Sequence, residues 1–151
     1  IPGTFGNHSR LVSEDDCIPC PPGSYCQQGS AEPTGPCLAG YYCPESSSVN
    51  NPFPCPAGTW SDRTDLYRVD QCLPCRPGYF CPQASTVEQP CPDGSYSPVN
   101  NTQAAGPHAS EGNNQCVVCP AGSYCPQASV FPVRCCASLS LCHSLAVSLL
   151  L

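Results

Sequence analysis

The cysteines are the residues of this sequence that could do chemistry, and three Cys-x-x-Cys motifs stand out among them. The chain has 151 residues, 16 of them cysteine, and the motifs start at Cys17, Cys72 and Cys116. Such motifs bind zinc, act as redox dithiols or hold structural disulfides. Zinc ribbons place two motifs about 15–20 residues apart, whereas these starts are 55 and 44 residues apart. We therefore expect no metal site and no cofactor.

Redox and hydrolytic chemistry find equally little support in the residue pattern. A redox dithiol needs a helix N-terminus to activate one thiol, and no helical periodicity follows Cys17-Ile-Pro-Cys20 or Cys72-Leu-Pro-Cys75. The histidines recur at no fixed spacing from a nucleophile or a carboxylate: His8, His108 and His143. The sequence therefore predicts a protein that is not an enzyme, with no catalytic residues and no small-molecule substrate.

The cysteines belong instead to a repeat of the form Cys-x-x-Gly-x-aromatic, found six times. The copies start at Cys20, Cys37, Cys55, Cys75, Cys91 and Cys119. Four copies are closed, because a cysteine follows the aromatic residue directly: Cys26, Cys43, Cys81 and Cys125. In the two open copies Ser61 or Ser97 stands there, and a polar loop leads to the next Cys-x-x-Cys motif. The glycine fits the positive-φ position of a tight turn, so each copy predicts a chain reversal with its aromatic ring over a neighbouring disulfide.

Two disulfide schemes satisfy the spacing. The favoured scheme closes each Cys-x5-Cys on itself and joins the open copies forward: Cys20–Cys26, Cys37–Cys43, Cys75–Cys81, Cys119–Cys125, Cys55–Cys72 and Cys91–Cys116. It leaves Cys17 to seek a partner upstream. The rival scheme bonds each Cys-x-x-Cys internally and joins Cys26–Cys37, Cys43–Cys55, Cys81–Cys91 and Cys125–Cys135. Internal Cys-x-x-Cys bonds are strained and reducible, which suits catalysts better than scaffolds. Cys135, Cys136 and Cys142 fit the repeat poorly.

The elements that position these cysteines must be short, because the composition supports no large apolar core. Leu, Ile, Val and Phe fill 26 of 151 positions, and 20 Pro and 12 Gly interrupt any regular element. The sequence therefore predicts a small disulfide-rich fold, an elongated tandem array of short two-stranded modules with mostly irregular structure. We expect each module to contact only its neighbours.

Charge and cysteine content limit the partners and the compartment. The net charge is −6, so a nucleic acid or an anionic membrane surface is a poor partner. Dense disulfides belong to oxidising compartments, so the sequence predicts a secreted protein or the extracellular part of a cell-surface protein. Two sequons in polar loops predict glycosylation, at Asn7 and Asn100.

The chain divides into five predicted segments: an N-terminal arm 1–16, repeats 17–54, 55–90 and 91–134, and a Leu/Ser-rich tail 135–151. The tail is an anchor signal, a truncated membrane helix or non-native sequence, and we expect membrane association only through it or through flanking segments. The charged stretch 62–70 is interpreted as a solvated surface loop or one helical turn.

The repeat strings CIPCPPGSYC, CLPCRPGYFC, CVVCPAGSYC, CPAGTWS and CPDGSYS resemble the ephrin-receptor-like cysteine-rich repeat. The resemblance covers about residues 17 to 135. It implies an extracellular mosaic protein in which such repeats serve as spacers or as protein–protein interaction modules, with an extracellular protein as partner. The alternative is a ligand-binding ectodomain fragment of a cell-surface receptor.

Overall fold

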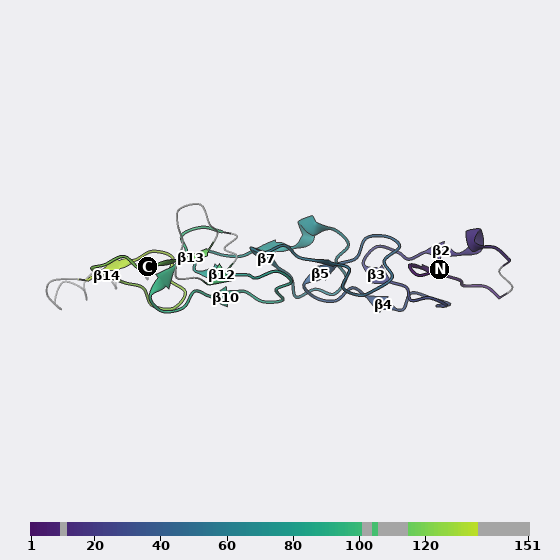
Figure 1. Cartoon of the computed structure of the whole chain (residues 1–151), viewed down its shortest axis with the longest axis horizontal. Coiled ribbons are helices and arrows are strands. Elements are labelled where there is room, and N and C mark those ends of the chain that lie inside the picture. Colours follow the sequence, from purple (N-terminus) through teal and green to yellow (C-terminus); the bar gives the residue numbers. More distant parts are fainter. Residues whose placement is uncertain (10–11, 101–103, 106–114, 136–151) are drawn as a thin grey trace, which may run out of the picture.

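The structure, a computed structural model, describes residues 1–9, 12–100, 104–105 and 115–135. These residues form an elongated array in which the chain runs from one end to the other (Figure 1). Short two-stranded antiparallel sheets follow one another along the array, with two short 3-10 helices at its side. The predicted fold class, a small disulfide-rich tandem array, is therefore confirmed.

The elements are brief because Gly and Pro recur every few residues. Their bounds, in chain order, are β1 Thr4–Phe5, η1 Glu14–Asp16, β2 Ile18–Pro19, β3 Ser24–Tyr25, β4 Gly35–Pro36, β5 Tyr41–Tyr42, β6 Phe53–Pro54, β7 Thr59–Trp60, η2 Val69–Gln71, β8 Leu73–Pro74, β9 Tyr79–Phe80, β10 Gln89–Pro90, β11 Ser95–Tyr96, β12 Ala104–Ala105, β13 Gln115–Val118, β14 Ser123–Tyr124 and β15 Val133–Arg134.

Each sheet pairs the residues after a repeat glycine with the two residues before the next repeat cysteine. The pairs are β1–β2, β3–β4, β5–β6, β7–β8, β9–β10, β11–β13 and β14–β15, all antiparallel, and β12 adds to β13 in parallel. In five of these pairs the second strand ends in proline. The cysteine after the proline donates its N–H to the glycine carbonyl directly before the partner strand. The proline nitrogen, one residue earlier, therefore faces away from the partner strand, where the absence of an N–H leaves no bond unmade.

The repeat glycines all adopt positive φ, between 79° and 89°. In the six copies the N–H after the glycine bonds the carbonyl three residues back, as in Tyr41 to Leu38 at 3.0 Å, which closes a tight turn. Gly3 has the same conformation, at φ 83°, and starts the same ribbon. We therefore number seven modules by their glycines: Gly3, Gly23, Gly40, Gly58, Gly78, Gly94 and Gly122. Residues 1–16, predicted as an arm, thus carry the first turn of the array.

Backbone hydrogen bonds join each module to the next. In modules 1 to 6 the glycine N–H donates to the carbonyl of the residue after the next module's aromatic residue, over 2.7–2.9 Å. The glycine carbonyl in turn accepts from the next repeat cysteine over 2.8–2.9 Å. The glycine therefore bonds the next module with both of its backbone groups.

Modules also touch their next-but-one neighbours, so the expectation of contacts between adjacent modules alone is wrong. A Cβ built on Gly40 in module 3 would lie 2.5 Å from the carbonyl oxygen of Ala84 in module 5. Gly3, Gly23 and Gly78 approach a backbone oxygen two modules ahead in the same way. Glycine is needed here both for its positive φ and because a side chain would displace that second neighbour.

The buried interior consists largely of sulfur. The buried apolar residues among those described are Leu66 and eleven disulfide-bonded cysteines. Around Leu66, the Cys55–Cys72 disulfide packs with the partly buried ring of Tyr42. In the described part of the chain, no helix has the length and apolar character needed to cross a membrane. The tail from residue 136 onward lies outside the described residues.

Candidate functional site

The chemistry of the repeat cysteines is disulfide formation. The described residues hold six disulfides: Cys20–Cys26, Cys37–Cys43, Cys55–Cys72, Cys75–Cys81, Cys91–Cys116 and Cys119–Cys125. This pairing is the same as the scheme that the sequence favours, and the bonds of the rival scheme are not formed. Closed modules therefore cross-link within one turn, and the open modules 4 and 6 cross-link the start of the module to the end of its loop.

Two cysteines of the described residues remain free, the half-buried Cys17 and the exposed Cys135. Both occupy positions of the repeat. Cys17 precedes β2 as Cys72 precedes β8, and the N–H of Cys135 donates to the Gly122 carbonyl over 2.8 Å, as each repeat cysteine does with the preceding glycine. Cys135 thus lies in the register of the array, although its sequence neighbourhood does not continue the motif.

The sequence interpretation missed a serine that connects modules. It lies four residues after the closing cysteine of every closed module: Ser30, Ser47, Ser85 and Ser129. Each hydroxyl donates to the carbonyl three residues back over 2.5–2.8 Å. The residue before each serine has positive φ, even where it is Ser46, Ala84 or Ala128. This constant Cys-to-Ser spacing was the signal that could have revealed the connector.

The connector serine also bonds the preceding module. Its carbonyl accepts from the N–H of the residue after the previous aromatic residue, over 2.9–3.0 Å: from Gly6, Cys26, Ser61 and Ser97. A hydroxyl that fixes its own turn therefore also orients a carbonyl toward the neighbour. We interpret the connector as a structural device of the array.

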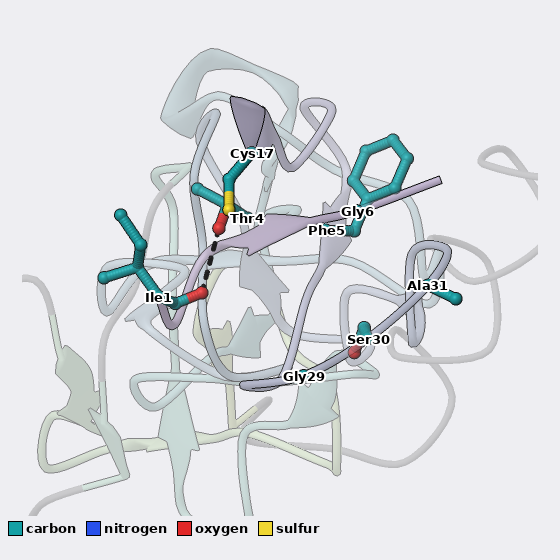
Figure 2. Close-up of a pocket in the computed structure, with 8 residues that line it drawn as sticks. All are labelled: Ile1, Thr4, Phe5, Gly6, Cys17, Gly29, Ser30 and Ala31. Atoms are coloured by element: carbon teal, nitrogen blue, oxygen red, sulfur yellow. Dashed lines mark hydrogen bonds between the residues drawn. The ribbon is translucent and has the colours of Figure 1, made fainter. Parts of the chain in front are cut away.

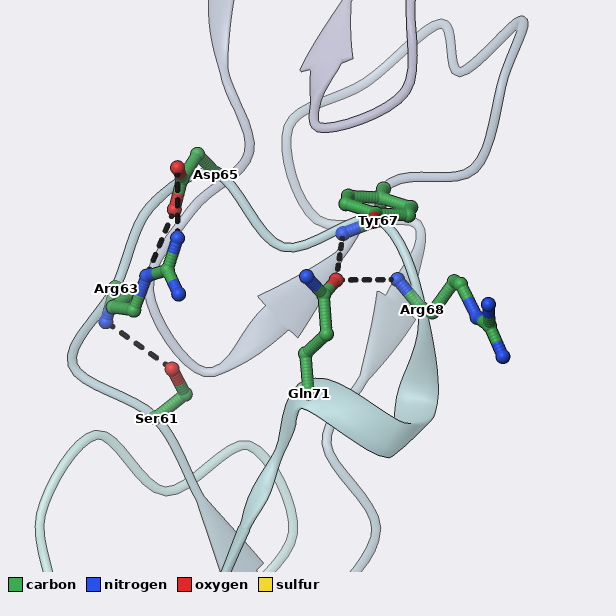
Figure 3. Close-up of polar contacts among 6 residues, drawn as sticks. All are labelled: Ser61, Arg63, Asp65, Tyr67, Arg68 and Gln71. Atoms are coloured by element: carbon green, nitrogen blue, oxygen red, sulfur yellow. Dashed lines mark hydrogen bonds and ion pairs between the residues drawn. The ribbon is translucent and has the colours of Figure 1, made fainter.

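The loop of module 4 carries a group of polar contacts (Figure 3). Arg63 donates to Asp65 through Nε and Nη2 over 3.2 and 3.0 Å, and its backbone N–H donates to Ser61 Oγ over 3.2 Å. The side-chain bond from Arg63 lowers the pKa of Asp65 below its ordinary value. Between these contacts and helix η2, Leu66 is fully buried. The stretch predicted as a surface loop or helical turn contains such a turn and also an apolar anchor.

A shallow groove lies on the surface beside this loop. Its cavity of about 530 Å³ is lined by Trp60, Leu73, Pro74, Arg76 and Glu88. Arg76 donates to the Glu88 carboxylate through its backbone N–H at 2.7 Å and through Nε at 2.6 Å, and its guanidinium lies 5.0 Å from the Tyr79 ring centroid. Leu73 remains 49% exposed. Tryptophan and arginine are enriched at protein–protein contacts, so this groove is the candidate contact surface.

A second cavity opens at the end of the array that holds module 1. It has about 210 Å³ and is lined by Ile1, Thr4, Phe5, Gly6, Cys17, Gly29, Ser30 and Ala31 (Figure 2). Its wall combines the turn of module 1 with the connector of module 2.

The predicted glycosylation sites Asn7 and Asn100 are both exposed, and glycosylation of them stays a prediction. Of the three histidines, His8 is exposed, and His108 and His143 lie outside the described residues. Within the described ranges, no three His, Cys, Asp or Glu side chains gather so as to hold a metal ion. Neither a protein-family model nor a curated protein matches this chain.

Proposed function

We propose that this chain is a non-enzymatic extracellular spacer that holds its flanking segments at a fixed separation. The observation that carries the proposal is the continuous backbone bonding along an elongated array. Every glycine of modules 1 to 6 bonds the next module, and four glycines also lie against the module after that. Contacts to two successive neighbours resist bending more than contacts to one.

An extracellular location is supported by the six disulfides, because disulfides of this density persist in oxidising compartments. We further propose that the repeats of this chain are ephrin-receptor-like cysteine-rich repeats. The support for this proposal is the spacing of the motif in the sequence. Such repeats suit a secreted or cell-surface protein.

A length measurement tests the spacer. Donor and acceptor fluorescent proteins are fused to the two ends of the full chain and of a chain lacking residues 55–90, which removes modules 4 and 5. The deletion joins module 3 to the open module 6, so Ser97 replaces Ser61 as the acceptor for Gly40. A rod that loses two of seven modules shortens by about two sevenths. A flexible coil of the same residue counts shortens by about an eighth, and that result would refute the spacer.

Small-angle scattering provides an independent check on the unlabelled chain. A compact domain of 151 residues has a radius of gyration of about 15 Å. The spacer requires a clearly larger value that does not change with salt, because backbone hydrogen bonds and disulfides hold the array. A radius of gyration near the compact value would contradict the proposal. A radius that changes with salt concentration, as that of a charged coil does, would contradict it too.

Protein binding is the second candidate, and the groove at Trp60 favours it. Leu73 lies in the groove and is 49% exposed, whereas Leu38 lies outside it and is 46% exposed. Binding of the chain to cells should therefore fall with Leu73→Asp and not with the matched control Leu38→Asp. Equal binding by both variants would exclude the groove as the contact surface.

A further inference from the structure

The cavity at module 1 can be understood by comparison with module 4, because the segment of module 1 that lines it has a similar segment in module 4. Residues 1–17 and 56–72 have the same length and align without gaps. Five of the 17 positions are identical, namely Gly3/Gly58, Thr4/Thr59, Leu11/Leu66, Asp15/Asp70 and Cys17/Cys72. Module 1 is therefore an open module like module 4.

The two segments also make the same hydrogen bonds. The Gly3 N–H donates to Cys26 over 2.9 Å, and the Gly58 N–H donates to Cys81 over 2.7 Å. The Thr4 hydroxyl donates to the Ile1 carbonyl over 2.9 Å, as Thr59 does to Pro56 over 2.7 Å. At the other end of each segment, a 3-10 helix leads into the cysteine, and Cys17 and Cys72 each donate to a carbonyl three residues back over 3.1 Å.

The difference between them is the partner of the last cysteine. Cys72 is buried and bonded to Cys55, which directly precedes Pro56. Cys17 is free. Because Ile1 aligns with Pro56, the position aligned with Cys55 lies directly before Ile1, and it would give the same sequence separation of 17.

In module 4 the residues that correspond to the cavity lining are covered by the preceding module. The residues that align with Gly6, Gly29 and Ser30 are Ser61, Ala84 and Ser85. Gly40 of the preceding module donates to the Ser61 carbonyl over 2.9 Å and lies against the carbonyl oxygens of Ala84 and Ser85. Cys55 accepts from the Ala84 N–H over 2.9 Å. A preceding module and its terminal cysteine therefore fill this place in the duplicate.

We infer that the cavity at Cys17 is the seat of one more repeat module, joined directly ahead of Ile1 and ending in a cysteine that forms a disulfide with Cys17. The glycine of this module would donate to the Gly6 carbonyl and lie against the connector at Gly29 and Ser30. The bond forms by thiol–disulfide exchange with a small-molecule disulfide such as oxidised glutathione. The two cysteine thiols lose two electrons and two protons, the new S–S bond forms, and one oxidised glutathione becomes two glutathione thiols. The inference does not depend on whether the array acts as a spacer.

The test extends the full chain with a copy of residues 37–55 placed directly ahead of Ile1, so that a cysteine precedes Ile1. Both chains are oxidised in a glutathione buffer, treated with iodoacetamide while folded, and mapped by mass spectrometry without reduction. We expect Cys17 to be alkylated in the original chain. In the extended chain we expect Cys17 to lose this reactivity and to be linked to the added cysteine before Ile1, with the six other disulfides unchanged.

Two controls separate the disulfide from the docking of the turn. An extension whose last cysteine is replaced by serine should leave Cys17 unpaired, so that Cys17 is alkylated once the chain is unfolded in denaturant. An extension by one cysteine alone should still form the bond, because Ile1 and Cys17 are held as Pro56 and Cys72 are. Unchanged alkylation of Cys17 in the extended chain, or pairing of the added cysteine elsewhere, would overturn the inference. Multimers of the original chain linked through Cys17 and Cys135 would overturn it too, because a second copy would then occupy the site.

Discussion

Closed and open modules have the same turn, yet they stabilise it with different chemistry. In a closed module the residue after the aromatic residue is a cysteine bonded six positions back. In open modules 4 and 6 it is Ser61 or Ser97, which are as deeply buried as the cysteines. The N–H at this position bonds a connector carbonyl in closed module 2 and in open modules 4 and 6, and in closed module 3 it bonds the Leu66 carbonyl. The comparison shows that the array needs the backbone geometry there, and that a sulfur bridge is one of two ways to hold it.

The first cysteine of the repeat has a different disulfide partner in the two kinds of module. In open module 4 the first cysteine bonds Cys72, 17 residues ahead, and in module 6 it bonds Cys116, 25 residues ahead. In module 4 the loop between the two bonded cysteines is thereby attached to the array at both ends. In module 4 this loop carries helix η2 and the buried Leu66. Open modules thus add a loop bounded by a disulfide to the frame that both kinds of module share.

The largest expected effect comes from removing one disulfide of each kind. Chain entropy predicts that Cys55→Ala with Cys72→Ala destabilises the folded state by about 3 kcal/mol, and Cys75→Ala with Cys81→Ala by about 2 kcal/mol, because the 17-residue loop is longer. Both changes lie beside Trp60, the one tryptophan of the sequence. Urea unfolding followed by its fluorescence gives both values. A larger loss for the closed module would show that native packing, and not loop length, sets the contribution.

A second prediction concerns the glycine that both kinds of module share. Gly78 and Gly94 have the same φ of 81°, but a Cβ on Gly78 would lie 2.4 Å from the Ala128 oxygen and one on Gly94 would meet nothing within 4 Å. Alanine at either site costs about 1–2 kcal/mol for its positive φ. We expect Gly78→Ala to cost about 1–3 kcal/mol more, because it overpacks the contact between modules. Equal urea midpoints for the two variants would mean that this contact does not stabilise the array.

A third prediction converts an open module into a closed one. Ser61→Cys creates the Cys-x5-Cys spacing in module 4, so Cys55 can bond either residue 61 or Cys72. Loop closure favours the shorter loop about fivefold, or about 1 kcal/mol. We therefore expect a disulfide map in glutathione buffer to show Cys55 bonded mainly to residue 61, with Cys72 free. Retention of Cys55–Cys72 would show that the loop around Leu66 directs the pairing.

Motif spacing predicted the turns and the closed-module disulfides because both are local. A turn needs only its glycine, and a Cys-x5-Cys bond needs only the chain between its ends. Contacts between Gly40 and Ala84 could not be predicted, since they depend on how successive turns stack in space. The turn at Gly3 was missed because its repeat cysteine would fall before Ile1. The burial of Leu66 was missed because charged residues surround it in the sequence, although its partner surface is the disulfide Cys55–Cys72.

The smallest expected effect compares two open modules and concerns pH. Asp16 accepts from the N–H groups of Val12 and Ser13, each over 2.9 Å, whereas in module 4 the amide oxygen of Gln71 accepts the corresponding bonds. The bond from Val12, followed by that from Ser13, lowers the pKa of Asp16 below its ordinary value. A lowered carboxyl pKa stabilises the fold at neutral pH, and this contribution is lost as the pH falls through that lowered pKa. The glutamine does not titrate. Amide exchange followed from neutral pH to about pH 2 should therefore show protection of Val12 and Ser13 falling relative to that of Tyr67 and Arg68, and Asp16→Asn should abolish this difference. A parallel fall in both modules would mean that acid acts on the whole array and not on this cap.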